Sequence, residues 1–287
     1  ISECLVGSEM CIRDSIKYFG EKLHTGRILI NCPSSQGAIG DLYNFRLEPS
    51  LTLGCGSWGG NSVSENVGVK HLMNVKTVAM REENMLWFKV PEKIYFKPGS
   101  LELALKELKG RKKAFLVTDK PLFDLGYTKK ITDVLEGLGI QYQIFSDVKP
   151  DPDLSTINVA INMVNTFQPY VIIALGGGSP MDVAKAVGVV AKYGGSITEY
   201  EGADKVPGDI IPLIAVPTTA GTGSEVTAFS VITDHSRNYK LTVFSYKLIP
   251  SYAILDAELL TTAPVSVAAA CGIDAMVHAL EAYISTA

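Results

Sequence analysis

Three consecutive glycines stand where an apolar, strand-like run changes into a helical pattern, in the stretch ALGGGSPMDVAKAV. Because Gly176 to Gly178 lack Cβ atoms, the backbone there can turn sharply and approach a ligand closely. Ser179 and Pro180 open the next helix, whose free N–H groups and dipole suit a phosphate. Asp182 would repel a bare phosphate, so we expect it to accept hydrogen bonds from a hydroxyl or from backbone N–H groups. A tight turn without a ligand explains the glycines about equally well.

A second loop of hydroxyl and glycine residues follows another apolar strand, in IIPLIAVPTTAGTGSEVTAF. Its residues 218–224 leave their strand at the same end of a parallel sheet as the glycine loop, so the two loops together predict a cradle for a pyrophosphate. Asp119 ends the strand-like run KAFLVTD. A carboxylate at that place could accept both hydroxyls of a ribose and repel the extra phosphate of NADP. A plain turn aspartate explains Asp119 equally well.

Asp274 and His278 stand four positions apart in the helical stretch GIDAMVH. That spacing puts both side chains on one helix face, one turn apart, where they could hold one metal ion. A simple hydrogen bond between the two side chains is the more frequent arrangement for such a pair. The pair alone therefore leaves both interpretations open.

The elements that must position these residues alternate regularly from about residue 93. The strand-like runs KIYFKPG, KAFLVTD, YQIFSDV and YVIIALGGGS precede the helical patterns SLELALKELKG, GYTKKITDVLEGLG, LSTINVAINMVNTF and PMDVAKAVGVVAKYG. Ser100 is expected to cap the first helix, and Gly110 and Gly139 to follow the ends of the first two. The alternation predicts an open, doubly wound α/β domain that binds its ligand at the carboxyl ends of the strands.

Composition narrows the class of function. The chain has 287 residues, of which 47% are hydrophobic and 20% charged, as is typical of a globular protein. A formal net charge of −4 offers no basic surface for nucleic acid or for an anionic membrane. No apolar run approaches the roughly 20 residues of a spanning helix. Five cysteines without a C-x-x-C pair, and no secretory signal, predict reduced thiols and a cytoplasmic protein whose partner is a small molecule.

Shifts in composition divide the chain into five segments. Residues 1–15, ISECLVGSEMCIRDS, have no initiator methionine and no regular period, so we expect a non-native leader there. Residues 16–78, rich in Gly, Ser and Asn, predict loops and edge strands from the margin of a larger domain. We expect a linker at 79–92, the α/β domain at 93–263, and the start of a helical domain at 264–287. Because the helical pattern has no stop signal at residue 287, the chain is expected to be a fragment.

Three motifs in this order, GGGSPMDVAK, PTTAGTGSEVT and GIDAMVHALEAY, resemble those of the iron-dependent (group III) alcohol dehydrogenases. The stretch NCPSSQGAIGDLYNFRLEPSLTLGCGSWGGNSVSENVG and the junction ENMLWFKVPEKIYFKPGS are similar to the bifunctional aldehyde-alcohol dehydrogenases, in which an aldehyde dehydrogenase domain precedes the iron-dependent one. The resemblance covers residue 16 to the end. It implies an aldehyde dehydrogenase tail at 16–78, an NAD-binding domain at 93–263 and the start of an all-helical metal-binding domain at 264–287.

The resemblance also implies roles for individual residues. The implied cofactor-binding residues are Asp119, Asp151, Gly177, Gly178, Ser179, Pro180, Met181, Asp182, Thr218, Thr219, Val231 and Lys240. Asp274 and His278 match two of the family's four ligands for Fe²⁺, with Zn²⁺ as the alternative metal, and the other two are histidines that would lie downstream. The nucleophilic cysteine of the aldehyde dehydrogenase domain would lie upstream, so the chain by itself is expected to be inactive.

The implied function is NAD-dependent and metal-dependent interconversion of ethanol and acetaldehyde. The whole protein would also oxidise acetaldehyde with coenzyme A, which serves only the missing aldehyde dehydrogenase part, and would form a homo-oligomer or a filament. One alternative is a glycerol dehydrogenase or dehydroquinate synthase relative of the same fold. The motif GTGSEVT and the aldehyde dehydrogenase tail argue against this alternative. Another is a segment that acts only in filament assembly, through an edge strand.

Overall fold

The computed structural model describes residues 5–8, 13–22, 27–30, 77–80, 89–261 and 263–284. By its internal contacts the chain divides into two units, one of residues 1–88 with 276–287 and the other of residues 89–275. The second unit contains the α/β domain that the alternating strands and helices predict.

A six-stranded sheet forms the centre of the second unit. Its strands are β4 (Lys93–Phe96), β5 (Lys113–Asp119), β6 (Gln141–Val148), β7 (Val171–Gly176), β9 (Leu213–Pro217) and β12 (Tyr252–Leu255). They lie in the order β4-β12-β9-β7-β5-β6, and every neighbouring pair is parallel. From β5 the chain adds β6 on one side and then crosses to β7 on the other, so the strand order reverses between β5 and β7. In doubly wound folds, that reversal point is where ligands bind.

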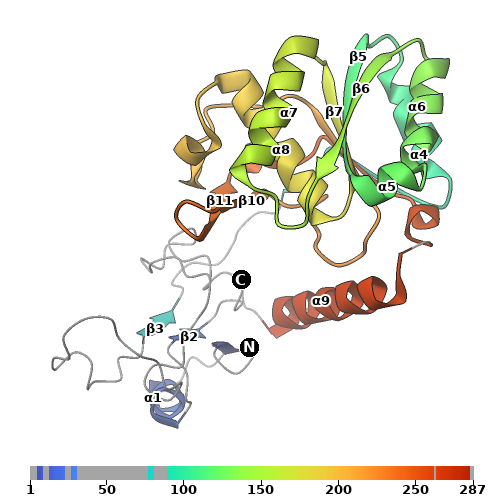
Figure 1. Cartoon of the computed structure of the whole chain (residues 1–287). Helices are drawn as coiled ribbons and strands as arrows, with labels where there is room; N and C mark the ends of the chain where they lie inside the picture. Colours follow the sequence, from blue (N-terminus) through green and yellow to red (C-terminus); the bar gives the residue numbers. More distant parts are fainter. Residues whose placement is uncertain are drawn as a thin grey trace. The chain divides into compact units, whose positions relative to one another are not determined.

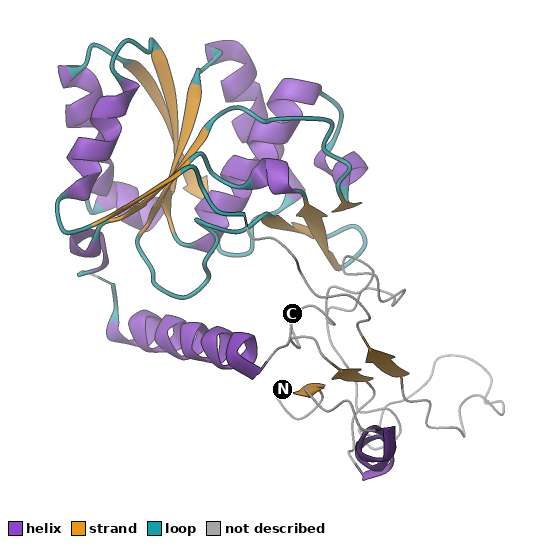
Figure 2. Cartoon of the chain, turned by 180° about the vertical axis from the view of Figure 1, so that it is seen from behind, coloured by secondary structure: helices purple, strands orange, loops and turns teal. Residues whose placement is uncertain are grey.

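Helices cover both faces of this sheet, as Figure 1 and the view from behind in Figure 2 show. The helices are α4 (Ser100–Leu105), α5 (Lys120–Asp124), α6 (Tyr127–Gly137), α7 (Leu154–Phe167) and α8 (Gly178–Tyr193), with 3-10 turns at η4 (Lys106–Leu108), η5 (Ile197–Tyr200), η6 (Tyr246–Leu248) and η7 (Ala257–Leu260). Helices α7 and α8 pack with Phe115 and Val117 of β5, whereas α4 and α6 pack with Leu116. This alternation follows from the two-residue period of a strand that is buried on both faces. The doubly wound prediction is confirmed.

A smaller sheet lies beside α8. Strands β10 (Phe229–Asp234) and β11 (Tyr239–Phe244) form an antiparallel hairpin, and β8 (Gly202–Ala203) pairs in parallel with β11. The hairpin register sets Lys240 opposite Thr233. On its other side, the backbone N–H of Thr233 donates to the carbonyl of Pro152 at 2.8 Å. The hairpin thus holds the segment between β6 and α7.

The start of α4 differs from the prediction. Ser100 is the first helical residue rather than the cap, and its buried hydroxyl has no hydrogen-bond partner among the described residues. The cap position belongs to Gly99, whose φ of 74° suits glycine. Asp256 instead accepts hydrogen bonds from the backbone N–H groups of Gly99 at 3.0 Å and of Leu101 at 3.1 Å. A carboxylate so distant in sequence caps the helix only because β12 lies beside β4.

The first unit contains a second parallel sheet, in the order β1-β2-β3, made of β1 (Leu5–Ser8), β2 (Arg27–Ile30) and β3 (Thr77–Met80), with helix α1 at Arg13–Lys22. Strand β1 and the start of α1 fall inside segment 1–15, where the sequence shows no strand period. Strand β3 extends into the expected linker at 79–92. Most of the expected aldehyde dehydrogenase tail at 16–78 lies outside the described residues, and the five-segment division stays a prediction.

The boundary between the two units along the sequence falls within helix α9 (Val265–Ile284). By length and composition it could cross a membrane, since an 18-residue window within it has a mean hydropathy of 1.4, and none of that window is buried. A membrane-spanning candidate was not predicted from the sequence. No other helix in the described part of the chain meets these criteria.

Candidate functional site

The glycine loop lies at the carboxyl end of β7 and opens directly into α8. Gly176 has a φ of 146°, and a Cβ atom built there would lie 2.6 Å from Cγ of Pro180, so only glycine fits. Helix α8 begins at Gly178 with Gly177 as its cap residue, and no side chain caps it. Its first N–H groups and the positive end of its dipole are therefore available to an anion.

The second loop lies directly against the glycine loop, as predicted. The backbone N–H of Thr218 donates to the carbonyl of Gly176 at 3.0 Å. A Cβ atom built on Gly177 would lie 3.1 Å from Oγ1 of Thr219, and one built on Gly178 would lie 3.5 Å from Cγ2 of Thr222. The two loops therefore form one polar cradle, in which both glycines keep the backbone of α8 close to the threonine hydroxyls.

Asp182 directs its carboxylate into the protein. Its Oδ1 accepts a hydrogen bond from Oγ of Ser224 at 3.1 Å, and its carboxylate accepts another from the backbone N–H of Val231. Its backbone carbonyl accepts a third, from Oγ of Ser230 at 2.8 Å. Burial raises the pKa of Asp182 to about 6, although Lys185 and these donors oppose the rise. The expectation of a hydroxyl and a backbone N–H as partners is confirmed, and the carboxylate joins α8 to β10.

Lys185 was missed by the sequence analysis. It is completely buried, and its Nζ donates to the carbonyl oxygens of Ser224 at 2.8 Å, Thr227 at 2.9 Å and Phe229 at 2.8 Å. Burial lowers its pKa to about 8, against the attraction of Asp182. The spacing of Asp182 and Lys185 is a signal that could have revealed it. A lysine three positions after an aspartate on a buried helix lies on the same helix face, and its buried charge requires hydrogen-bond partners.

Asp119 lies at the carboxyl end of β5, across the strand reversal from the glycine loop. It caps the short helix α5, since its Oδ1 accepts from the backbone N–H of Leu122 at 2.9 Å. The side chain is half-buried, and this burial raises its pKa. Asp119 thus caps a helix at the carboxyl end of β5. Its contact with a cofactor stays a prediction.

Asp151 and Lys240 form an ion pair at the edge of the domain. Nζ of Lys240 lies 2.8 Å from Oδ1 of Asp151, and Asp151 has a φ of 51°, in the left-handed region. The resemblance implies that both residues lie near the cofactor. The structure brings them to each other, and their contact with a cofactor stays a prediction.

Met181 can contribute only its backbone to the cradle. Its side chain is completely buried in the core between α8 and the sheet. Ser179 and Pro180 lie in the first turn of α8, as predicted. Of the implied set, the groups that meet between the two loops are the backbone of Gly177 on one side and the side chain of Thr219 on the other.

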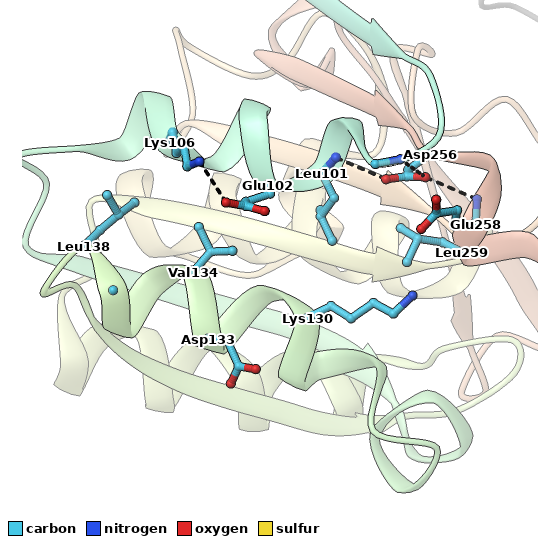
Figure 3. A pocket seen from close by; sticks show the side chains of 12 residues that line it. Leu101, Glu102, Lys106, Lys130, Asp133, Val134, Leu138, Asp256, Glu258 and Leu259 are labelled. Carbon is cyan, nitrogen blue, oxygen red and sulfur yellow. Dashed lines mark hydrogen bonds and ion pairs between the residues drawn. The ribbon is translucent and has the colours of Figure 1, made fainter.

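A cleft of about 580 Å³ lies elsewhere, between α4 and α6 and beside η7 (Figure 3). Leu101, Val134 and Leu259 line it together with charged side chains, among them Glu102 and Lys106, which form an ion pair at 2.7 Å. None of the implied cofactor residues lines this cleft. We place the candidate site at the two loops, because they meet at the strand reversal and carry free N–H groups.

The two residues expected to bind a metal lie on one helix. Asp274 and His278 both lie on α9, four positions apart, and both are exposed. Across the described ranges, no group of three or more His, Cys, Asp or Glu side chains could hold a metal ion. Two donors fall short of the three protein ligands that a catalytic metal typically requires. The second loop approaches this helix at Gly221, where a Cβ atom would lie 2.6 Å from the carbonyl oxygen of Cys271.

Residues 91–257 match the family model described as iron-containing alcohol dehydrogenase. The chain belongs to this family. It is 52% identical over 285 residues to the bifunctional aldehyde-alcohol dehydrogenase AdhE of Escherichia coli K12, an alignment that covers 94% of this chain and 32% of that protein. The chain spans about a third of the length of the curated relatives it matches first.

Solved structures of iron-containing alcohol dehydrogenase relatives share the fold. A 1,3-propanediol oxidoreductase matches with a TM-score of 0.67 and 36% identity, over 70% of this chain and 53% of that one. The sulfoacetaldehyde reductase of Bifidobacterium kashiwanohense, solved in complex with NAD⁺, matches with a TM-score of 0.61 and 34% identity, over 67% and 51% of the two chains. The family is one of oxidoreductases that contain iron, and it includes proteins that bind NAD⁺.

Proposed function

We propose that this chain supplies the NAD-binding domain of a metal-dependent alcohol dehydrogenase, within a bifunctional protein that interconverts acetaldehyde and ethanol. One observation carries the proposal. The glycine loop and the second loop lie side by side at the reversal of strand order, where a doubly wound sheet binds nucleotides. The similarity to bifunctional relatives over nearly the whole chain supports the wider assignment.

The residues of the cradle fit a dinucleotide. The N–H groups that begin α8 would hold the pyrophosphate, and the inward direction of the Asp182 carboxylate removes the repulsion that a phosphate would otherwise meet. Asp119 would accept the adenosine ribose hydroxyls, and Thr218 and Thr219 would lie on the adenine side. Val231, Lys240 and Asp151 would complete the pocket. NAD itself supplies the hydride acceptor, and these residues bind and orient it.

Asp274 and His278 would be two ligands of the Fe²⁺ or Zn²⁺ ion in the whole protein. The described residues alone do not complete its coordination, so the reaction at the metal belongs to the whole protein. Its substrate would be a small alcohol or aldehyde, and coenzyme A would serve the aldehyde dehydrogenase part. We infer a homo-oligomer or filament in the cytoplasm, without nucleic acid or membrane partners, in keeping with the net charge of −4.

A titration of the 287-residue chain with NADH, followed by its fluorescence, tests the cofactor site. We expect saturable binding that Gly177→Val weakens at least tenfold, because the added side chain would enter the space beside Thr219. Gly137→Val is the matched control, since Gly137 lies in α6 with nothing within 4 Å of a built Cβ. Equal affinity of the Gly177→Val variant and the unchanged protein would show that the glycine loop is only a turn.

A further inference from the structure

Lys185 is a charged side chain in the core of the α/β domain, with no exposed surface. Burying an ammonium group is costly unless every N–H finds an acceptor. Here the acceptors are three backbone carbonyls, those of Ser224, Thr227 and Phe229, each 2.8 to 2.9 Å from Nζ. The three carbonyls lie within residues 224–229, which run from the end of the second loop to the first residue of β10. Lys185 therefore donates hydrogen bonds to backbone carbonyls that lie outside its own helix.

These hydrogen bonds anchor the second loop at its far end. At its near end, the backbone N–H of Thr218 is bonded to the carbonyl of Gly176. Between the two anchors lie Thr219 and Thr222, the residues that contact the glycine loop. A loop that is held at both ends keeps these hydroxyls in place without a ligand, so little ordering entropy remains to be lost when a ligand binds.

Two carboxylates act on Lys185 electrostatically. Asp182 lies three positions earlier on α8, and Glu225 lies in the anchored segment itself, and both favour the charged ammonium. Burial opposes them and lowers the pKa of Lys185 to about 8. The ammonium form, which has an N–H for each of the three carbonyls, is therefore lost as pH rises through about 8. A neutral amine has only two N–H groups for the same three acceptors.

We propose that Lys185 is a positioning residue that holds the second loop against the glycine loop and so forms the phosphate cradle before NAD arrives. This inference rests on the proposed function, because the cradle is taken to bind NAD. Lys185 itself has no exposed surface and does not contact the cofactor. It acts through the backbone of Ser224, Thr227 and Phe229.

The first test compares Lys185→Met with Lys192→Met in the 287-residue chain. Methionine has a similar length and no donors, and Lys192 is an exposed lysine on the last turn of the same helix. We expect Lys185→Met to speed amide hydrogen exchange at residues 218–229 at least tenfold and to weaken NADH binding by at least tenfold. Lys192→Met should change neither. Lys185→Gln, which keeps two N–H donors, should have an exchange rate and an NADH affinity between those of Lys185→Met and Lys192→Met. It replaces Lys185→Met in the test if the methionine variant does not fold.

The second test uses the unchanged protein. Its NADH affinity should fall between pH 7 and pH 9 as Lys185 loses its proton, while the affinity of Lys185→Gln, without a titrating amine, stays level over that range. Lys192→Met should reproduce the pH profile of the unchanged protein. A purely structural side chain would alter affinity without removing this pH step.

The outcomes separate the two proposals. Unaltered exchange at residues 218–229 in both Lys185 variants, or an unchanged pH step in Lys185→Gln, would overturn the positioning role even if NADH binds. If the unchanged protein bound no NADH while Lys185→Met still loosened residues 218–229, the proposed function would fail, and Lys185 would be an anchor of the loop without a cofactor role.

Discussion

Two charged side chains of α8 point into the protein rather than toward the two loops' outer surface. Asp182 and Lys185 lie three positions apart on α8, and both bond to groups within the protein. Asp182 accepts hydrogen bonds from Ser224 and Val231, and Lys185 donates to three backbone carbonyls. Asp119 also accepts a backbone N–H bond. The surface offered to an anion is therefore made of backbone N–H groups and hydroxyls, which bind phosphates without repelling them.

Asp119 should decide the choice between NAD and NADP. In Asp119→Asn the capping oxygen stays and the negative charge is lost, so repulsion of the 2′-phosphate disappears. We expect the preference for NADH over NADPH to narrow by on the order of tenfold, since charges this close interact by more than about 1 kcal/mol. Asp119→Gly should relax the preference as well. Fluorescence titrations with both cofactors measure the ratio, and an unaltered ratio in the asparagine variant would remove Asp119 from the cofactor site.

Among the elements, α4 depends on a contact that is remote in sequence. Asp256 follows β12, is almost completely buried, and accepts the backbone N–H groups of Gly99 and Leu101. It also accepts that of Glu258 at 3.2 Å, at the start of η7. One carboxylate thus ties the edge of the sheet to a helix and to a 3-10 turn, beside the cleft of Figure 3.

Asp256→Ala should lower the free energy of unfolding by about 2 kcal/mol, because it leaves buried N–H groups without an acceptor. Asp124→Ala is the control, since Asp124 forms only an exposed ion pair with Lys120 and should change stability by less than about 0.5 kcal/mol. Urea denaturation followed by circular dichroism measures both. Equal stability of the two variants would mean that Asp256 is not the cap of α4.

At the scale of the whole molecule, the described residues form the cradle of two loops but no group of three side chains that could hold a metal ion. The two loops meet in the α/β domain, whereas Asp274 and His278 are two exposed candidate metal ligands on α9. The chain also spans about a third of the length of its bifunctional relatives. Cofactor binding and turnover should therefore separate in this chain.

We expect the 287-residue chain to bind NADH but to form none from ethanol and NAD when Fe²⁺ or Zn²⁺ is added without oxygen. Two ligands bind a catalytic metal weakly and leave no site that could stabilise charge on an alcohol oxygen. We expect no aldehyde oxidation either, because none of the cysteines in these 287 residues matches the nucleophile that the resemblance implies. NADH absorbance follows both reactions. Metal-dependent turnover above the blank would show that another residue, with His235 the nearest histidine in sequence, completes the coordination.

The alternation of strands and helices from β4 to α8, the parallel sheet and the position of the glycine loop could be predicted from the sequence, because they follow from local patterns. Strand and helix periods, the positive φ of Gly110 and Gly139, and glycines after an apolar strand are properties of a few neighbouring residues. The partners of Asp182 were predictable as well, since a carboxylate near the start of a helix takes hydroxyl or N–H donors.

Only the tertiary structure decided how these local pieces meet. It replaced Ser100 with Asp256 as the partner at the start of α4, buried the side chain of Met181, and paired Lys240 with Asp151. It also revealed Lys185, whose acceptors lie about forty residues further along the chain. The physical reason is common to all of these. A buried polar group takes whichever partner the packing of distant strands and helices brings within about 3 Å, and no local period of the sequence records that distance.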